Sequence, residues 1–322
     1  MAVPFPFGVV WGILLKKAVW CDTIISLNIQ GVFSMFGFRP DGKKIKKIDP
    51  LMKLVPHIMN DRSDSMVMAP AVIDCMGLDN YIFTKRRSTD ERFTYMDIII
   101  AGLVRTIAER PRLNRFIMNG RVYARNAITV AITVKKMLTD QGEETTVKLN
   151  FNGTETIQEI KTQIDKEIQA NTKVTSVNDA DKLAKVLTHI PNFMIKIAVG
   201  FLKFLDLHGL LPKSIIDFSP FHTSVFITNM KSIKMGYVYH HIYNFGTTSI
   251  FLSLGKEKYE SIVIDPELKL LDVKKLLTMG GVIDERTCDG LYFGNSIRTF
   301  MRYMEHPDLL ETPLEKKIED TL

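Results

Sequence analysis

Seven consecutive residues near the carboxyl end of the chain combine groups that can exchange protons: Asp284-Glu285-Arg286-Thr287-Cys288-Asp289-Gly290. The ordinary pKa of a glutamate, about 4.3, lies far below that of a thiol, about 8.5, so Glu285 in water would be a weak base toward a thiol. Burial can raise a carboxyl pKa by several units and make the carboxylate a competent base. Cys288 would need a nearby base and a lowered pKa to act as a nucleophile. We interpret Cys288 as a packed small side chain, which leaves Glu285 as the candidate for proton transfer.

Apolar residues upstream recur at spacings typical of regular elements that could hold this segment in place. Apolar side chains at helical spacing predict a helix over residues 97–109, which ends before Pro111. Alternating apolar residues predict one strand over residues 121–134 and a second over 147–151. Thr154 can cap a further helix whose inward face is formed by four isoleucines: Ile157, Ile160, Ile164 and Ile168.

The middle of the chain changes from polar to apolar. Residues 171–182 are polar and predict a loop. Residues 183–211 are mostly apolar and are broken at Pro191. Two lysines interrupt this stretch well short of the ~20 residues that a membrane span needs. We interpret the stretch as a core or subunit-contact helix, with a membrane-seated helix as the weaker alternative.

The last third of the chain carries three β-rich runs and a helix. Strands are predicted over residues 223–229, 247–254 and 276–284, and a final helix over 291–306. Strands and helices do not alternate regularly along the chain, so a parallel βαβ arrangement is not indicated. This mixture predicts an α+β fold with helices layered on a largely mixed or antiparallel sheet.

The bulk composition narrows the classes of function. The chain has 322 residues, a net charge of +6 and a pI of about 9.0, which suits anionic ligands but is too mild to demand nucleic acid. We expect no nucleic acid partner, because no basic block is interleaved with aromatic residues. The seven histidines and three cysteines show no metal-ligand spacing, so we predict no metal. Well-separated cysteines favour a reducing compartment and a cytoplasmic protein.

The amino-terminal residues differ from the rest. Residues 1–34 contain two apolar runs separated by lysines, and neither run is long enough to span a membrane. A segment that reads as a domain start begins at Met35. We therefore predict an apolar extension over 1–34, outside the natural start of the protein, and one domain over 35–322. A membrane-surface anchor is the alternative for the extension.

Several stretches occur in the order typical of one family. They are Pro56-His57, Pro111-Arg112-Leu113-Asn114, the segment from Asn119-Gly120 to Thr133, Thr223 to Met230, and Gly281 to Gly290. On these stretches the chain resembles the chloramphenicol-acetyltransferase-like superfamily, and within it the catalytic domain of the 2-oxo acid dehydrogenase dihydrolipoyl acyltransferases. The resemblance covers roughly residues 40–310.

This resemblance implies a two-layer fold with a mixed sheet, a homotrimer, and coenzyme A bound in a channel between subunits. It also implies transfer of an acyl group from acyl-coenzyme A to a thiol or hydroxyl acceptor of a small molecule. The family motif reads Asp-His-Arg-x-x-Asp-Gly, so Glu285 stands where the family has its histidine base. Asp289 and Gly290 match the structural partners of that base, and Thr228 matches the hydroxyl that donates to the oxyanion.

Two departures from the family leave alternatives open. Glu285 could support acyl transfer, or the protein could be a catalytically silent homologue retained for ligand binding or assembly. No lipoyl-bearing or subunit-binding domain is recognised upstream, so we do not expect a working component of a dehydrogenase complex. Thr228 could also be an ordinary strand threonine. A histidine could restore the base from an adjacent subunit, and the candidates are His240, His241 and His222.

Overall fold

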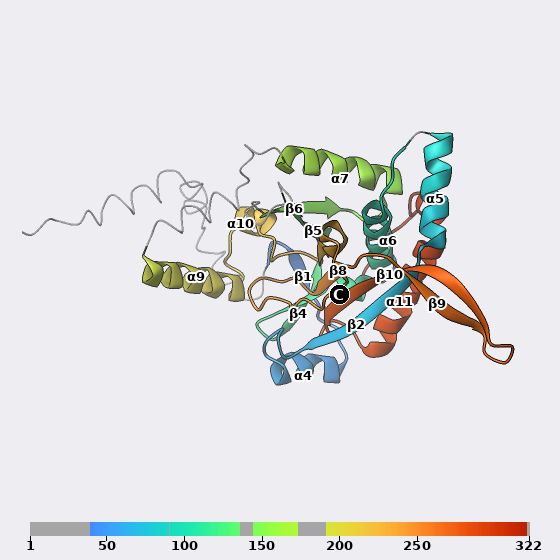
Figure 1. Ribbon diagram of the computed structural model, residues 1–322. Helices are drawn as coiled ribbons and strands as arrows, with labels where there is room; N and C mark the ends of the chain where they lie inside the picture. Colours follow the sequence, from blue (N-terminus) through green and yellow to red (C-terminus); the bar gives the residue numbers. More distant parts are fainter. Residues whose placement is uncertain (1–38, 90, 136–143, 173–190, 321–322) are drawn as a thin grey trace, which may run out of the picture.

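Ten strands in two sheets form the framework of the computed structural model, which describes residues 39–89, 91–135, 144–172 and 191–320 (Figure 1). The strands are β1 Gly42–Lys44, β2 Met66–Asp74, β3 Arg115–Met118, β4 Arg121–Arg125, β5 Ile128–Lys135, β6 Glu144–Phe151, β7 Val225–Asn229, β8 Ile250–Leu254, β9 Lys258–Asp265 and β10 Leu270–Asp284. The helices are α4 Pro50–Ile58, α5 Cys75–Ser88, α6 Tyr95–Glu109, α7 Ile157–Thr172, α9 Asn192–Leu207, α10 Lys213–Phe218 and α11 Gly290–Glu305. Short 3-10 turns lie at η1 Pro111–Asn114, η2 Met230–Ile233 and η3 Pro307–Leu310.

The large sheet is mixed, as the sequence predicts. Its strand order is β2-β10-β8-β7-β5-β6, and β9 pairs with the first half of β10. The pairs β2–β10, β10–β8 and β5–β6 are antiparallel, whereas β8–β7 and β7–β5 are parallel. A small second sheet has the order β1-β4-β3. The two-layer α+β class is therefore confirmed.

Helices cover one face of the large sheet. α6 lies at the centre of this layer and contacts α7 and α11, and nearly all of its residues are buried. Thr94 and Asp97 form a capping box that fixes the start of α6. Inward side chains of the strands, such as Val225, Ile227 and Met279, join the helices in the main hydrophobic core. Since β10 leads directly from this core toward α11, the core positions the loop between β10 and α11.

The opposite face of the sheet carries a smaller apolar cluster and an irregular segment. Ala131, Phe226, Phe251 and Val282 pack there with Ile242, which belongs to the connection between β7 and β8. This connection crosses the sheet near Gly280, where an added Cβ would lie 2.3 Å from the carbonyl oxygen of Val238. Glycine is therefore required at 280 because the crossing backbone leaves no room for a side chain.

Most of the sequence-predicted elements are present, with two corrections. The strand expected over 121–134 is two strands, β4 and β5, which are separated at Asn126 and Ala127. The helix expected in the apolar stretch is α9, but it is not a core helix, because its apolar residues are exposed: Phe193, Ile197, Phe201, Phe204 and Leu207. Its contact with another subunit stays a prediction. Residues 173–182 of the expected loop, residues 183–190 and the extension over 1–34 lie outside the described residues, so the domain boundary stays a prediction as well.

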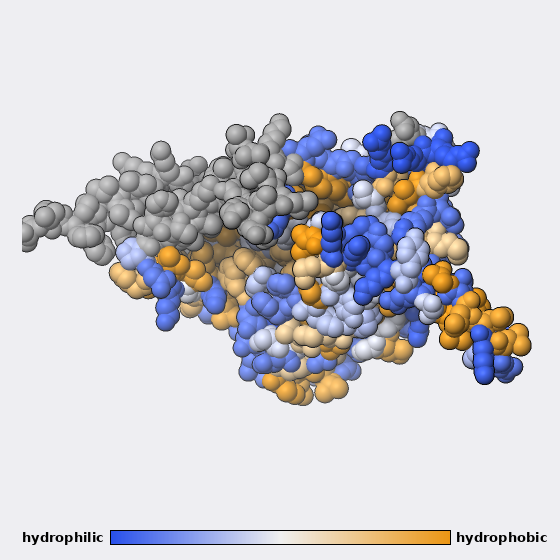
Figure 2. Space-filling model, viewed as in Figure 1, coloured by the Kyte–Doolittle hydropathy of each residue, from blue (hydrophilic) through white to orange (hydrophobic). Residues whose placement is uncertain are grey.

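The hairpin of β9 and β10 is longer than the sequence indicated. It extends away from the helices and the sheet, and Figure 2 shows apolar side chains along it. The exposed apolar residues on it include Tyr259, Val263, Leu271 and Val273. The predicted strand began at 276, whereas β10 begins at Leu270.

Candidate active site

A buried ion pair shapes the loop between β10 and α11. The guanidinium of Arg286 donates from Nε to Oδ1 of Asp284 at 2.8 Å and from Nη2 to Oδ2 at 2.7 Å. Its Nη1 donates to the carbonyl oxygens of Met59 and Asn60, and Ser65 Oγ donates to Asp284 Oδ1. Both charged side chains are at most 2% exposed. Because this pair ties the loop to the segment before β2, the backbone at 285 is held firmly.

Glu285 lies on the outside of this loop. Its backbone N–H donates to the carbonyl oxygen of Ser65 at 3.0 Å, and Glu285 is exposed to solvent. The side chain of Arg286 turns inward to Asp284, whereas that of Glu285 is exposed. Within one chain, the carboxylate of Glu285 is therefore not desolvated.

Asp289 organises the start of α11. Its Oδ1 accepts from the backbone N–H of Tyr292 at 2.8 Å, which makes it the N-cap of the helix. Its Oδ2 forms an exposed ion pair with Arg112 at 3.4 Å. Asp289 therefore sits on the same loop as Glu285, four residues later, and has a structural role.

Cys288 is not an activated nucleophile. Its side chain is buried, and burial raises the pKa of its thiol to about 11. A thiol with that pKa is protonated near neutral pH and reacts slowly. The interpretation of Cys288 as a packed side chain agrees with this position.

Thr228 lies near the end of β7 on the face opposite the helices. It follows Phe226 of the smaller cluster by two residues, so the two side chains share one face of the sheet, and it pairs with Ser253 of β8. Its hydroxyl faces the sulfur of Met230 at 3.9 Å. Because a thioether is a weak acceptor, the hydroxyl could turn to a better acceptor at little cost.

The structure does not bring Thr228 and Glu285 together within one chain. The registers place Thr228 beside Ser253 and Ser253 beside Gly280, and Glu285 follows Gly280 by five residues. Five residues along a strand and two strand spacings correspond to a separation of about 19 Å. A site that uses both residues therefore needs two copies of the chain.

His222 is buried in a polar network away from both residues. Its Nε2 lies 3.1 Å from Oδ2 of Asp206, and its Nδ1 lies 2.8 Å from the hydroxyl of Ser219. Arg39 holds Asp206 from the other side at 3.0 Å. Burial lowers the pKa of His222, and its side chain is only 1% exposed. His222 therefore anchors α9 and cannot reach a substrate.

His240 and His241 lie on the same side of the sheet as Thr228. The ring of His240 stacks on Phe251 with 4.1 Å between centroids, and Phe226 stacks on Phe251 with 4.8 Å. His241 stacks on His240 with 4.7 Å between centroids. His240 is half-buried, whereas His241 is exposed.

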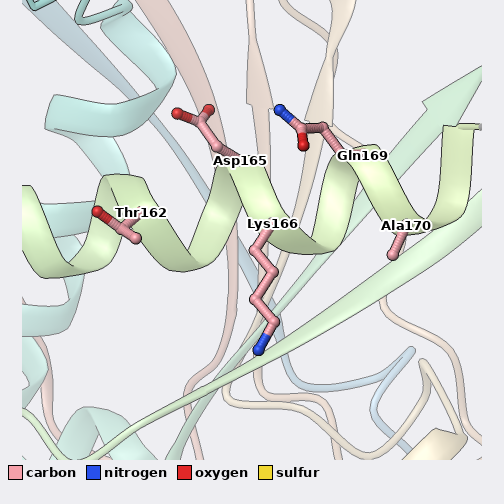
Figure 3. A pocket seen from close by; sticks show the side chains of 5 residues that line it. All are labelled: Thr162, Asp165, Lys166, Gln169 and Ala170. Atoms are coloured by element: carbon pink, nitrogen blue, oxygen red, sulfur yellow. The ribbon is translucent and has the colours of Figure 1, made fainter.

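A surface depression elsewhere holds none of the predicted site residues. It measures about 480 Å³ and is lined by five residues of α7: Thr162, Asp165, Lys166, Gln169 and Ala170. Figure 3 shows that Asp165 and Lys166 point to different sides of the helix, so the polar groups do not converge. In the described ranges, no three His, Cys, Asp or Glu side chains gather as metal ligands, and no helix is long and apolar enough to cross a membrane. The absence of a metal stays a prediction.

Comparisons with known proteins identify the fold. No protein-family profile matches the chain, and no curated protein matches it. The cubic core of the pyruvate dehydrogenase multienzyme complex is similar over 83% of this chain and 94% of its own, with 10% identity and a TM-score of 0.51. Dihydrolipoamide acetyltransferase of Azotobacter vinelandii has the same coverage, 10% identity and a TM-score of 0.50. Chloramphenicol acetyltransferase is similar over 82% of this chain and 99% of its own, with 10% identity and a TM-score of 0.50.

The chain therefore has the chloramphenicol-acetyltransferase-like fold, which the sequence motifs predicted. In the Azotobacter enzyme, a serine, a histidine and an asparagine four positions after it have been studied for their role in catalysis. The sequence located the loop at 284–290, but it did not reveal the pair of Asp284 and Arg286 as its anchor. Only the fold shows that Arg286 reaches Met59 and Asn60, more than 200 positions away along the chain.

Proposed function

We propose that this protein is a coenzyme A-dependent acyltransferase that moves an acyl group from acyl-coenzyme A to a thiol or hydroxyl of a small molecule. The fold supports this class of reaction, and the spacing of the loop carries the proposal. Glu285 and Asp289 are four positions apart in the loop between β10 and α11. The histidine and asparagine of the Azotobacter enzyme are also four positions apart. Thr228 precedes Glu285 along this chain by a number of residues similar to that between the serine and the histidine of the Azotobacter enzyme.

The proposed site lies between two copies of the chain. One copy contributes Glu285 at the reacting position and Asp289 as the organiser of its loop. A second copy contributes the hydroxyl of Thr228, which donates to the oxyanion of the thioester as the acceptor attacks. The separation of about 19 Å within one chain supports this division. A homotrimer is the assembly that we propose, and a similar fold occurs in the cubic core of a multienzyme complex.

Cytoplasmic location is part of the proposal. Cys75 and Cys288 are both buried free thiols. Free thiols of this kind persist in a reducing compartment. Coenzyme A and its thioesters would serve there as the co-substrate.

A silent homologue that binds coenzyme A or only assembles is the second candidate. The exposure of Glu285 favours it, since a solvated carboxylate is a weak base toward a thiol. Turnover distinguishes the two functions. The purified protein is incubated with acetyl-coenzyme A and a panel of thiol and alcohol acceptors, and acylated products are detected by mass spectrometry. Acyl transfer that falls at least tenfold in Glu285→Gln supports the enzyme, whereas coenzyme A binding by calorimetry with no product supports the silent homologue.

A further inference from the structure

The connection between β7 and β8 places one histidine in a fixed position on the exposed side of the sheet. The backbone N–H of Val238 donates to the hydroxyl of Ser253 at 2.9 Å, and that hydroxyl donates to the carbonyl oxygen of Val238. The close approach at Gly280 holds the same backbone from the neighbouring strand. Two residues later, the ring of His240 lies parallel to Phe251, with 9° between the planes. The imidazole is therefore oriented before any ligand arrives.

The hydrogen bond of His240 selects the tautomer that a base needs. Its Nδ1 lies 2.8 Å from the carbonyl oxygen of His241. A carbonyl oxygen only accepts, so Nδ1 carries the proton and Nε2 of the neutral ring carries the lone pair. No described side chain forms a hydrogen bond or ion pair with Nε2 of His240. This nitrogen is free to accept a proton.

The hydroxyl of Thr228 lies on the same face of the sheet as His240, close enough for both to contact one bound thioester. Thr228 and Phe251 lie on adjacent strands and are offset by two residues, so their Cα atoms are about 8 Å apart. The ring of His240 lies 4.1 Å from that of Phe251. A base, an attacking thiol, the thioester carbonyl and an oxyanion donor together span about 10 Å. His240 and Thr228 of one copy can therefore bracket one reacting thioester.

We propose that His240 is the general base of the acyl transfer, on the same copy as Thr228. This inference rests on the proposed function, and it supplies the imidazole that Glu285 replaces in the loop. His222 cannot take this role because it is buried against Asp206. His241 lacks the packed position, since its ring is exposed at the outer end of the stack.

The reaction step follows from these positions. Nε2 of His240 takes the proton from the acceptor thiol as its sulfur forms a bond to the thioester carbon. Thr228 donates to the carbonyl oxygen while it carries negative charge. The bond between carbon and the sulfur of coenzyme A then breaks, and the imidazolium returns the proton to the leaving thiolate. Glu285 of a second copy stabilises the imidazolium while it exists.

Paired variants test this assignment. His240→Phe keeps an aromatic ring on Phe251 and removes the base, and His241→Phe is the matched control on the neighbouring residue. We expect His240→Phe to lower kcat/KM by about 10²–10⁴-fold, mainly through kcat. His241→Phe should retain the wild-type kcat and KM.

The outcomes separate this inference from the proposed function. Acyl transfer that is unchanged in His240→Phe overturns the role of His240 and leaves the acyltransferase standing. No acyl transfer in the wild-type protein overturns the acyltransferase, and imidazole ¹⁵N NMR with added coenzyme A then tests the place of His240. A shift of the Nε2 resonance that is lost in His240→Phe and kept in His241→Phe supports a position beside the thiol. No shift of that resonance overturns it.

Discussion

Loss of charge at Asp284 should destabilise the whole protein, because the pair that it forms with Arg286 is buried. Asp284→Asn preserves the shape of the side chain, so it creates no cavity, but it leaves the guanidinium without its carboxylate. The two bonds measure 2.8 and 2.7 Å, and hydrogen bonds to charged groups contribute about 1.5–3 kcal/mol each. Removal of one partner from a buried pair costs about 3–5 kcal/mol. We expect the free energy of unfolding to fall by about that amount.

Urea denaturation at pH 7, followed by circular dichroism, measures this change. The matched control is Asp217→Asn, which removes the carboxylate of an exposed pair with Lys213 on α10. Exposed pairs four residues apart on a helix contribute about 0.3–0.5 kcal/mol, so the control should barely change the urea midpoint. A loss below about 1 kcal/mol in Asp284→Asn would refute the reasoning, because it would show that Arg286 is not dependent on its buried partner.

Three further predictions concern single positions. Burial lowers the pKa of His222. As the pH falls below about 6.5, the unfolded chain therefore binds a proton at this histidine before the folded chain does. The free energy of unfolding should then decline by up to about 1.4 kcal/mol per pH unit. His222→Gln should remove that dependence in urea titrations between pH 8 and 5, and an unchanged slope would contradict it. Asp289→Ala should cost about 1 kcal/mol through loss of the cap on Tyr292, whereas Asp289→Asn should cost less, as thermal unfolding can show. Gly280→Ala should displace the backbone at Val238 and lower the melting temperature, and an unaltered crystal structure of the variant would exclude the close contact.

Residue spacing predicted the elements that are buried along most of their length. α6 lies between the sheet and two other helices and is apolar on nearly every side, so the helical spacing of its apolar residues over 97–109 was clear in the sequence. The sequence did not reveal β2, since it has Pro70 in its interior and forms one edge of the sheet. The sequence did not reveal α5 for a different reason. The helix is mostly polar from its second turn onward, and only three of its residues are buried.

The candidate site divides in the same way. The loop at 284–290 could be proposed from the sequence because its residues are contiguous, and Thr228 could be proposed because its strand has a characteristic pattern. The distance between Thr228 and Glu285 depends on the register of three strands, which no local pattern encodes. The position of His240 depends on a backbone crossing that Gly280 permits, so the two histidines could only be described as candidates.

Subunit complementation tests most directly whether the site is formed by two copies. Thr228→Ala and Glu285→Gln proteins are each expected to be nearly inactive, and they are then co-expressed with different tags and purified together. Purification through both tags selects mixed assemblies, and in a mixed trimer about one third of the interfaces combine an intact Thr228 with an intact Glu285. We predict recovery of about one third of the wild-type turnover in the mixture. Activity in the mixture no greater than in the separate variants would contradict a site shared between copies.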